Sequence, residues 1–292
     1  MKIKKGIALL ITVVMLAALS ILVLKSYNIS GKFIKDNDTI RVLAQSNRLF
    51  LDSKKIFKAN FKDLNDTQAF QYLFSKPFVI PSNVFKITFI FNPVDNRVNI
   101  NKILHNSKIN KEIYSLLENI LISYNVEDSD FFLKIVLDTI DKDNDERVYG
   151  SEIAKQNRFF SNGEIYSKEE WMQIIDYYAQ NRDDKNIYKI PWSKYIGFKG
   201  NSIDINFASL QLIKFLLPNQ TVDQSFKDKY YNSFKDLSVD KKRENILKKI
   251  GVVFDTSRVL AKIRYNNFNK NIDISYIYDI KYKSISDIKY TF

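Results

Sequence analysis

The stretch FVIPSNVFKITFIFNPVDNRVNI, residues 78–100, decides the fold that we expect for this chain. Apolar side chains recur at every second residue in its centre and so share one face of an extended strand: Phe85, Ile87, Phe89 and Phe91. Pro93 to Asn96 then have the composition of a turn. The stretch therefore predicts β-strands.

The pattern changes near residue 109, and apolar residues then recur with the period of an α-helix until about residue 250. Ser167 and Glu170 form a capping box, in which each side chain satisfies a free backbone N–H at a helix start. Pro218 ends a short helix that begins at Ser209. The predicted apolar stripes comprise Ile113, Leu116, Leu117, Ile120 and Leu121; Phe132, Ile135, Val136 and Ile140; and Trp171, Ile174, Ile175 and Tyr178.

Alternation of apolar and polar residues returns at the C-terminus, in the segments RVLAKIRY, NIDISYIY and SDIKYTF. We expect these segments to form antiparallel strands that pair with the first strand region across the helical block. The predicted fold class is therefore α+β, with an antiparallel sheet that a large all-α insertion interrupts.

One apolar segment, Ile7 to Leu24, has the length of a membrane-spanning helix. It carries no charged residue, and a bilayer core of about 30 Å requires about 17 to 25 apolar residues in a helix. Lys2, Lys4 and Lys5 precede it, and because such positive flanks stay in the cytoplasm, we expect the body of the protein to be exported. The alternative is a cleaved secretory signal peptide, although Leu22 to Lys25 offer no small-residue cleavage site.

Composition limits the chemistry and the partners that the chain could have. The chain has no cysteine, which excludes disulfides, thiolate catalysis and zinc–sulfur sites. Its net charge of +12 suits a phosphate-bearing partner such as nucleic acid or lipid. The basic residues are spread over the whole chain, however, so a lysine-rich composition without a binding patch is the simpler interpretation.

An acidic segment contains the sharpest local motif, Asp141-Lys-Asp-Asn-Asp-Glu-Arg-Val-Tyr-Gly-Ser-Glu152. Four carboxylates match the template of a calcium loop: Asp141, Asp143, Asp145 and Glu152. Glu146 replaces the glycine of the sixth position. Alternate residues of a tight loop turn their carboxylates toward one point, which suits a hard cation with roughly six to eight oxygen ligands. The motif predicts a calcium site that pins the loop, and a solvated acidic loop is the alternative.

No motif indicates an enzyme. The single histidine, His105, lies among polar turn residues and is expected at the surface. The G-x-S-x-G elbow, the P-loop and G-x-G-x-x-G are all absent from the sequence. We therefore expect a protein without catalytic activity.

The N-terminal segment resembles the leader of a type IV prepilin. A membrane peptidase cuts that leader after a glycine, here Gly6, and leaves an apolar helix that here begins at Ile7. Most pilins carry Glu as the fifth mature residue, a place that Ile11 occupies in this chain. In this respect the chain resembles the minor pseudopilin K of type II secretion systems, the general secretion pathway protein K family.

Four further segments resemble motifs of that family, in order along the chain. They are Asn96–Leu104, similar to its N-x-N strand end; Thr139–Glu152, similar to its acidic D-x-D-D-E loop with Thr139 in place of Trp; Asn162–Glu170, similar to its N-x-x-F-x-S-x-E-E step; and Ile203–Ser209, similar to its I-N-V-N-T-A segment with Phe207 in place of Thr. Together these matches cover nearly the whole chain.

The resemblance implies a pilin-like α+β fold with a long N-terminal helix. It divides the chain into a prepilin leader (1–6), a transmembrane and assembly helix (7–60), the first part of an α/β head (61–105), an α-helical insertion domain (106–250) and C-terminal antiparallel strands that complete the head (251–292). Calcium in the insertion also agrees with the family.

For function, the resemblance implies a cap at the tip of a type II secretion pseudopilus, which initiates pseudopilus assembly for protein export across the outer membrane. The implied partners are the prepilin peptidase, the minor pseudopilins of types I and J, the major pseudopilin, and the secretin or exported proteins. The chain would cross the inner membrane once, with a cytoplasmic N-terminus, methylated after cleavage, and a periplasmic body.

The missing glutamate fits a tip position. In pilins this Glu neutralises the N-terminal amine of an adjacent subunit inside lipid, where an unpaired charge is unfavourable. A first subunit with nothing above it needs no such acid. Two alternatives stay open: a pseudopilin of a DNA-uptake machine, which would give the basic charge a purpose, and an unrelated membrane-anchored periplasmic binding domain.

Overall fold

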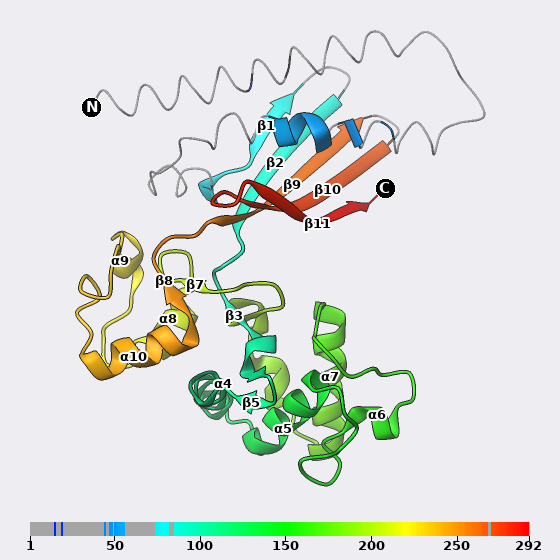
Figure 1. Cartoon of the computed structure of the whole chain (residues 1–292), viewed down its shortest axis with the longest axis vertical. Helices are drawn as coiled ribbons and strands as arrows, with labels where there is room; N and C mark the ends of the chain where they lie inside the picture. The colour runs from blue at the N-terminus through cyan, green and yellow to red at the C-terminus, as the bar shows by residue number, and fades with distance from the viewer. Residues whose placement is uncertain are drawn as a thin grey trace. The chain divides into compact units, whose positions relative to one another are not determined.

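The computed structural model describes residues 50–55, 74–81, 85–267 and 270–291, together with positions 15, 19, 44, 47 and 48 (Figure 1). The predicted leader and its cleavage site between Gly6 and Ile7 lie outside these residues. The predicted membrane helix also lies outside them, except for positions 15 and 19. Among the described residues, no helix is long and apolar enough to cross a bilayer.

The chain divides into two compact units, which we call the sheet unit and the helical unit. The sheet unit comprises residues 1–93 and 257–292, and the helical unit comprises residues 94–256. The predicted boundary at residue 106 lies inside the helical unit. The strands of the sheet unit are β1 (Phe78–Pro81), β2 (Phe85–Pro93), β9 (Arg258–Asn267), β10 (Lys270–Asp279) and β11 (Ser284–Thr291).

The helical unit contains α-helices, short 3-10 helices and two-residue strands. The α-helices are α4 (Lys111–Ser123), α5 (Ser129–Ile140), α6 (Ile153–Gln156), α7 (Lys168–Arg182), α8 (Leu210–Leu216), α9 (Gln224–Lys227) and α10 (Lys241–Ile250). The 3-10 helices are η1 (Ile100–Ile103), η2 (Asn186–Lys189) and η3 (Trp192–Lys194). The strands are β3 (Val98–Asn99), β4 (Leu104–His105), β5 (Lys108–Ile109), β6 (Ile196–Gly197), β7 (Ile203–Asp204) and β8 (Val252–Val253).

In the described part of the sheet unit, five strands form one antiparallel sheet in the order β1-β2-β9-β10-β11 (Figure 1). Strand β2 pairs with β9 over its whole length, with Pro93 opposite Val259 and Ile87 opposite Tyr265. The two strand regions therefore pair across the helical unit, as predicted from their alternation. The α+β class with an antiparallel sheet is confirmed.

One face of the sheet is buried. Along β9, Val259, Ala261 and Ile263 are buried, whereas the residues between them are not. The helical turn at residues 50–55 lies against this sheet, because the rings of Phe50 and Tyr276 meet edge to face at 5.3 Å. The Tyr276 hydroxyl also donates a hydrogen bond to Ser53 Oγ at 3.0 Å. The helical turn at residues 50–55 thus packs against β10, an inner strand of the sheet.

Helix starts in the helical unit follow the capping rule. Each of its seven α-helices begins after a side chain that accepts a backbone N–H of the first turn: Asn110, Asp128, Glu152, Ser167, Ser209, Asp223 and Asp240. The predicted capping box of Ser167 and Glu170 is confirmed at the start of α7. Helix α8 ends shortly before Pro218, also as predicted.

The apolar stripes of the predicted helices form the core of this unit. All thirteen predicted core residues of α4, α5 and α7 are buried. At the centre, the Phe132 ring lies 5.7 Å from Trp171 and 5.7 Å from Trp192, and the two indoles lie 5.1 Å apart. We call these three residues the aromatic centre.

The prediction that the insertion is all-α is wrong in detail. Three pairs of two-residue strands, β3 with β6, β4 with β5 and β7 with β8, join segments of the helical unit. Two residues are too few to produce an alternating pattern, which needs roughly four or more. The first of these pairs also places Val98 inside the helical unit, ahead of the predicted boundary.

Candidate metal site in the acidic loop

The acidic loop, residues 141–152, connects α5 to α6. Asp141 is the C-cap of α5, and its N–H donates to Leu137 O at 3.1 Å. Glu152 is the N-cap of α6, and its Oε1 accepts the N–H of Ala154 at 3.0 Å. The two helix ends therefore fix the first and last predicted ligands.

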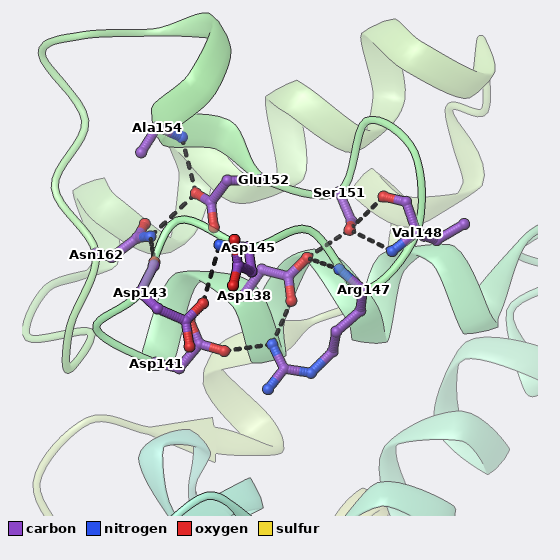
Figure 2. A network of polar contacts seen from close by, with 10 residues as sticks. All are labelled: Asp138, Asp141, Asp143, Asp145, Arg147, Val148, Ser151, Glu152, Ala154 and Asn162. Carbon is purple, nitrogen blue, oxygen red and sulfur yellow. Dashed lines mark hydrogen bonds and ion pairs between the residues drawn. The ribbon is translucent and has the colours of Figure 1, made fainter.

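On the α5 side, one guanidinium pairs with two carboxylates (Figure 2). Arg147 Nη1 donates to Asp138 Oδ1 and to Asp141 Oδ2. The other oxygen of Asp138 accepts the N–H of Arg147 at 3.1 Å and the hydroxyl of Ser151. Asp138 is completely buried near the C-terminal end of α5, where the helix dipole is also negative, so its charge needs this compensation.

On the α6 side, an amide links the loop to a later segment. Asn162 Nδ2 donates to Glu152 Oε1 at 3.0 Å and to the main-chain oxygen of Asp143 at 2.7 Å. The Asp143 side chain accepts the N–H of Asp145 at 2.9 Å, which tightens the turn. Figure 2 shows Glu152 pointing toward Asp145 and Asn162.

Three buried oxygens of this region have no hydrogen-bond partner: Asp141 Oδ1, Glu152 Oε2 and Asn162 Oδ1. Leaving a buried acceptor unpaired costs about 1–3 kcal/mol, and more when the group is charged. Glu152 is the extreme case, because its side chain is fully buried and negatively charged. All three atoms are acceptors, which is the kind of oxygen that a hard cation binds.

Burial also perturbs the acidity of the two carboxyl groups. Burial raises the pKa of Glu152, and the hydrogen bond from Asn162 only partly opposes this effect. Burial likewise raises the pKa of Asp141, although Arg147 acts in the opposite direction. In both groups the main cause is loss of hydration, which disfavours the charged form of the carboxyl group.

The donor set fits calcium, whereas a finished coordination shell is not formed. Hard oxygen ligands are what calcium prefers, and the unpaired atoms are carboxylate and amide oxygens. Within the described ranges, however, no three His, Cys, Asp or Glu side chains are grouped so that they could hold a metal ion. Of the four predicted ligands, the structure links Asp143 with Glu152 through Asn162, and it ties Asp141 to Arg147.

The sixth position of the template explains part of the difference between this loop and a finished calcium loop. Glu146 does not make a left-handed turn, and its Oε2 accepts the N–H of Gly150 at 3.1 Å. The left-handed residue of the loop is Gly150, with φ of 81°. The sharp turn therefore comes four residues later than in the template.

Three important residues were not predicted as site residues: Asp138, Arg147 and Asn162. Asp138 lies one turn before Asp141, and an acid near the negative end of a buried helix is a signal that a cation is close. Asn162 begins a family-like motif, but nothing local connects it to the loop. His105, on β4, is exposed as expected.

Comparisons with known proteins bear on the whole chain. No model of a protein family and no curated protein matches the sequence. Among solved structures, the chain is similar to a chain in the crystal structure of the GspK-GspI-GspJ complex from the enterotoxigenic Escherichia coli type 2 secretion system. The TM-score is 0.65 at 11% identity, over 88% of this chain and 98% of that one. The predicted resemblance to the minor pseudopilin K is thereby confirmed at the level of the fold.

Proposed function

We propose that this chain is a minor pseudopilin of a type II secretion system, of the K type, and that it acts at the tip of the pseudopilus. The observation that carries this proposal is the shared fold with a chain of the GspK-GspI-GspJ complex over nearly the full length of both. The role is one of assembly, without catalysis. The DNA-uptake alternative is not favoured, because the similar structure comes from a secretion system.

The sheet unit supports a pilin-like arrangement. In such a head, a long N-terminal helix lies across an antiparallel sheet, and here the turn at residues 50–55 contacts Tyr276 of β10. The helical unit is inserted between β2 and β9, which are neighbours in the sheet. A bulky insertion in the head would hinder the addition of a further subunit.

The N-terminal sequence supports insertion in the inner membrane with a periplasmic body. Ile7 to Leu24 would be the membrane segment, and Gly6 would be the last residue of the leader. Ile11, in place of the pilin glutamate, would suit a subunit that starts the assembly. In this proposal the partners are pseudopilins of types I and J and the major pseudopilin, with prepilin peptidase as the processing enzyme.

The mature N-terminus tests the pilin part of this proposal. The full chain would be expressed together with a prepilin peptidase and its intact mass measured. We expect a chain that begins at Ile7, and a Gly6→Leu variant that keeps its leader. A wild-type chain that still begins at Met1 in the presence of active peptidase would contradict the proposal.

We also propose that the acidic loop binds one calcium ion. The residues that would hold it are Asp141, Asp143, Asp145 and Glu152, with the side-chain oxygen of Asn162. The ion would supply positive charge to buried oxygens and so fasten the loop to the segment that contains Asn162.

Thermal unfolding tests the calcium proposal. We expect a chelator to lower the melting temperature of the wild-type chain and the Asp143→Ala variant to lose this response. Asp228→Ala removes an exposed acid at the C-cap of α9, away from the acidic loop in sequence, and should keep the response to chelator. An unchanged wild-type melting curve in chelator would count against the site.

A further inference from the structure

We propose that Arg147 is a built-in cation of the acidic loop, which holds the α5 side closed without metal and leaves only the α6 side for a divalent ion. This inference extends the calcium proposal to the regulation of the same site. It rests on that proposal only for the ion at Glu152, and not for the role of Arg147.

The α5 side is already compensated by protein groups. Asp138 is completely buried, and both of its oxygens accept hydrogen bonds from Arg147, one from the guanidinium and one from the main chain. The hydroxyl of Ser151, near the end of the loop, donates a further hydrogen bond to Asp138 Oδ2. A planar guanidinium with five donors can bridge two carboxylates, and its charge is permanent. Asp138 therefore does not require an external cation.

The α6 side lacks such a group. In the described part of the chain, no lysine or arginine forms an ion pair with Asp143, Asp145 or Glu152. The nearest cation of α6, Lys155, instead lies 3.9 Å from Glu146. Glu152 is fully buried with one oxygen unpaired, and Figure 2 shows this side chain pointing into the loop. This half of the loop carries negative charge without a positive partner.

Asp141 joins the two halves. Its Oδ2 is occupied by Arg147, while its Oδ1 is buried and unpaired. Arg147 thus fixes the carboxylate through one oxygen and leaves the other for the ion. Without the guanidinium, the buried Asp138 and the largely buried Asp141 would form a second uncompensated pair of carboxylates, which a second cation could neutralise.

The test uses the full chain in detergent, with calcium chloride as the probe, and compares Arg147→Met with wild type and with Arg158→Met. Arg158 is an exposed residue of the nearby segment, and its guanidinium lies over the Phe159 ring. We expect Arg147→Met to unfold at a lower temperature than wild type in chelator, whereas Arg158→Met should match wild type. Millimolar calcium should raise the melting temperature of Arg147→Met more than that of wild type.

Equilibrium dialysis gives the second readout. We expect wild type to bind one calcium ion and Arg147→Met to bind one more. If Arg147→Met does not fold in chelator, the double variant Asp138→Asn with Arg147→Met decides the matter, because it removes both charges. This double variant should fold in chelator and show no additional calcium response.

Two results would overturn the inference: an Arg147→Met variant that melts like wild type in chelator, or one that calcium fails to stabilise more than wild type. The same measurements distinguish failure of the calcium proposal from failure of the Arg147 proposal. If wild type bound no calcium while calcium stabilised Arg147→Met, the calcium proposal would be contradicted and the role of Arg147 would stand. If wild type and Arg147→Met each bound one calcium ion and were stabilised equally by it, the calcium proposal would stand and the role of Arg147 would be contradicted.

Discussion

Helix α5 carries two different kinds of anchor within six residues. Near its start, Phe132 packs against Trp171 and Trp192, in contacts that depend only on shape and exclusion of water. Near its end, Asp138 is held by hydrogen bonds from Arg147 and Ser151. The first anchor involves no charge, although the indole N–H of Trp171 is buried without a hydrogen-bond partner, whereas the second depends on matched charges and ends in a loop with unpaired oxygens. The helical unit should therefore be insensitive to ions at one end of α5 and sensitive at the other.

The largest effect is expected at the aromatic centre. Phe132→Ala would leave a cavity among the rings and should lower the free energy of unfolding by about 3–5 kcal/mol. Urea denaturation with calcium and with chelator should give the same loss, since no charge is involved. Phe159→Ala is the control, because this ring is 83% exposed and its removal should change stability by less than about 0.5 kcal/mol. If calcium restored the stability that Phe132→Ala loses, the contrast between the two ends of α5 would be contradicted.

Removing the charged anchor is expected to rank second. Asp138→Ala should lower the free energy of unfolding by about 2–3 kcal/mol, less than for a fully buried pair, because the Arg147 side chain is 29% exposed. Asp273→Ala breaks the exposed pair of Asp273 with Arg264 and should cost only about 0.2–1 kcal/mol. Equal losses in the two variants, measured by urea denaturation, would show that burial of Asp138 has no energetic consequence.

A buried carboxylate elsewhere in the helical unit sharpens the comparison through pH. Asp204 of β7 is fully buried with one oxygen unpaired, and burial raises its pKa from 3.8 to about 6. A raised folded pKa means that its contribution to stability is complete below pH 3.8 and is lost as the pH rises through about 6.

Asp204→Asn should therefore stabilise the protein above pH 7 by about 1–2 kcal/mol and have little effect near pH 4. The difference in free energy of unfolding between wild type and variant, followed across this pH range, isolates the group from other titrations. A stabilisation that is the same at all pH values would contradict the assigned pKa.

The smallest effect is expected at a helix cap. Ser167→Ala removes the acceptor for the N–H of Glu170 at 3.1 Å and should lower the free energy of unfolding by about 1 kcal/mol. Ser161→Ala, at an exposed position before α7, is the matched control. Because the cap is neutral, calcium should not alter the loss. A larger loss in chelator would mean that α7 and the acidic loop are coupled.

Periodicity explains which parts of the fold could be predicted. Ile87 and Phe91 of β2 and Val259 to Ile263 of β9 are recognised because a strand repeats every two residues and one face is buried. Trp171 and Tyr178 follow from the helical repeat after a capping box. Two-residue strands such as β7 and β8 carry no repeat, so their pairing depends on tertiary contacts.

The acidic loop could be predicted only in part. Spacing predicts Asp141, Asp143, Asp145 and Glu152 as ligands, because the ligands of a compact calcium loop are local in sequence, and this set stays a prediction. The contact between Asp138 and Arg147 depends on the path of the loop and on the direction of a long side chain, which spacing does not specify. The contact between Asn162 and Glu152 requires the chain to return after α6.

Complex formation tests the central claim, that this chain is a minor pseudopilin of the tip complex, most directly. The full chain would be co-expressed with prepilin peptidase and with the pseudopilins of types I and J from the same cell, and then purified through a tag on this chain. Native mass spectrometry should find one complex that contains all three processed proteins. A chain that purifies alone, while the other two proteins are present and processed, would contradict the account.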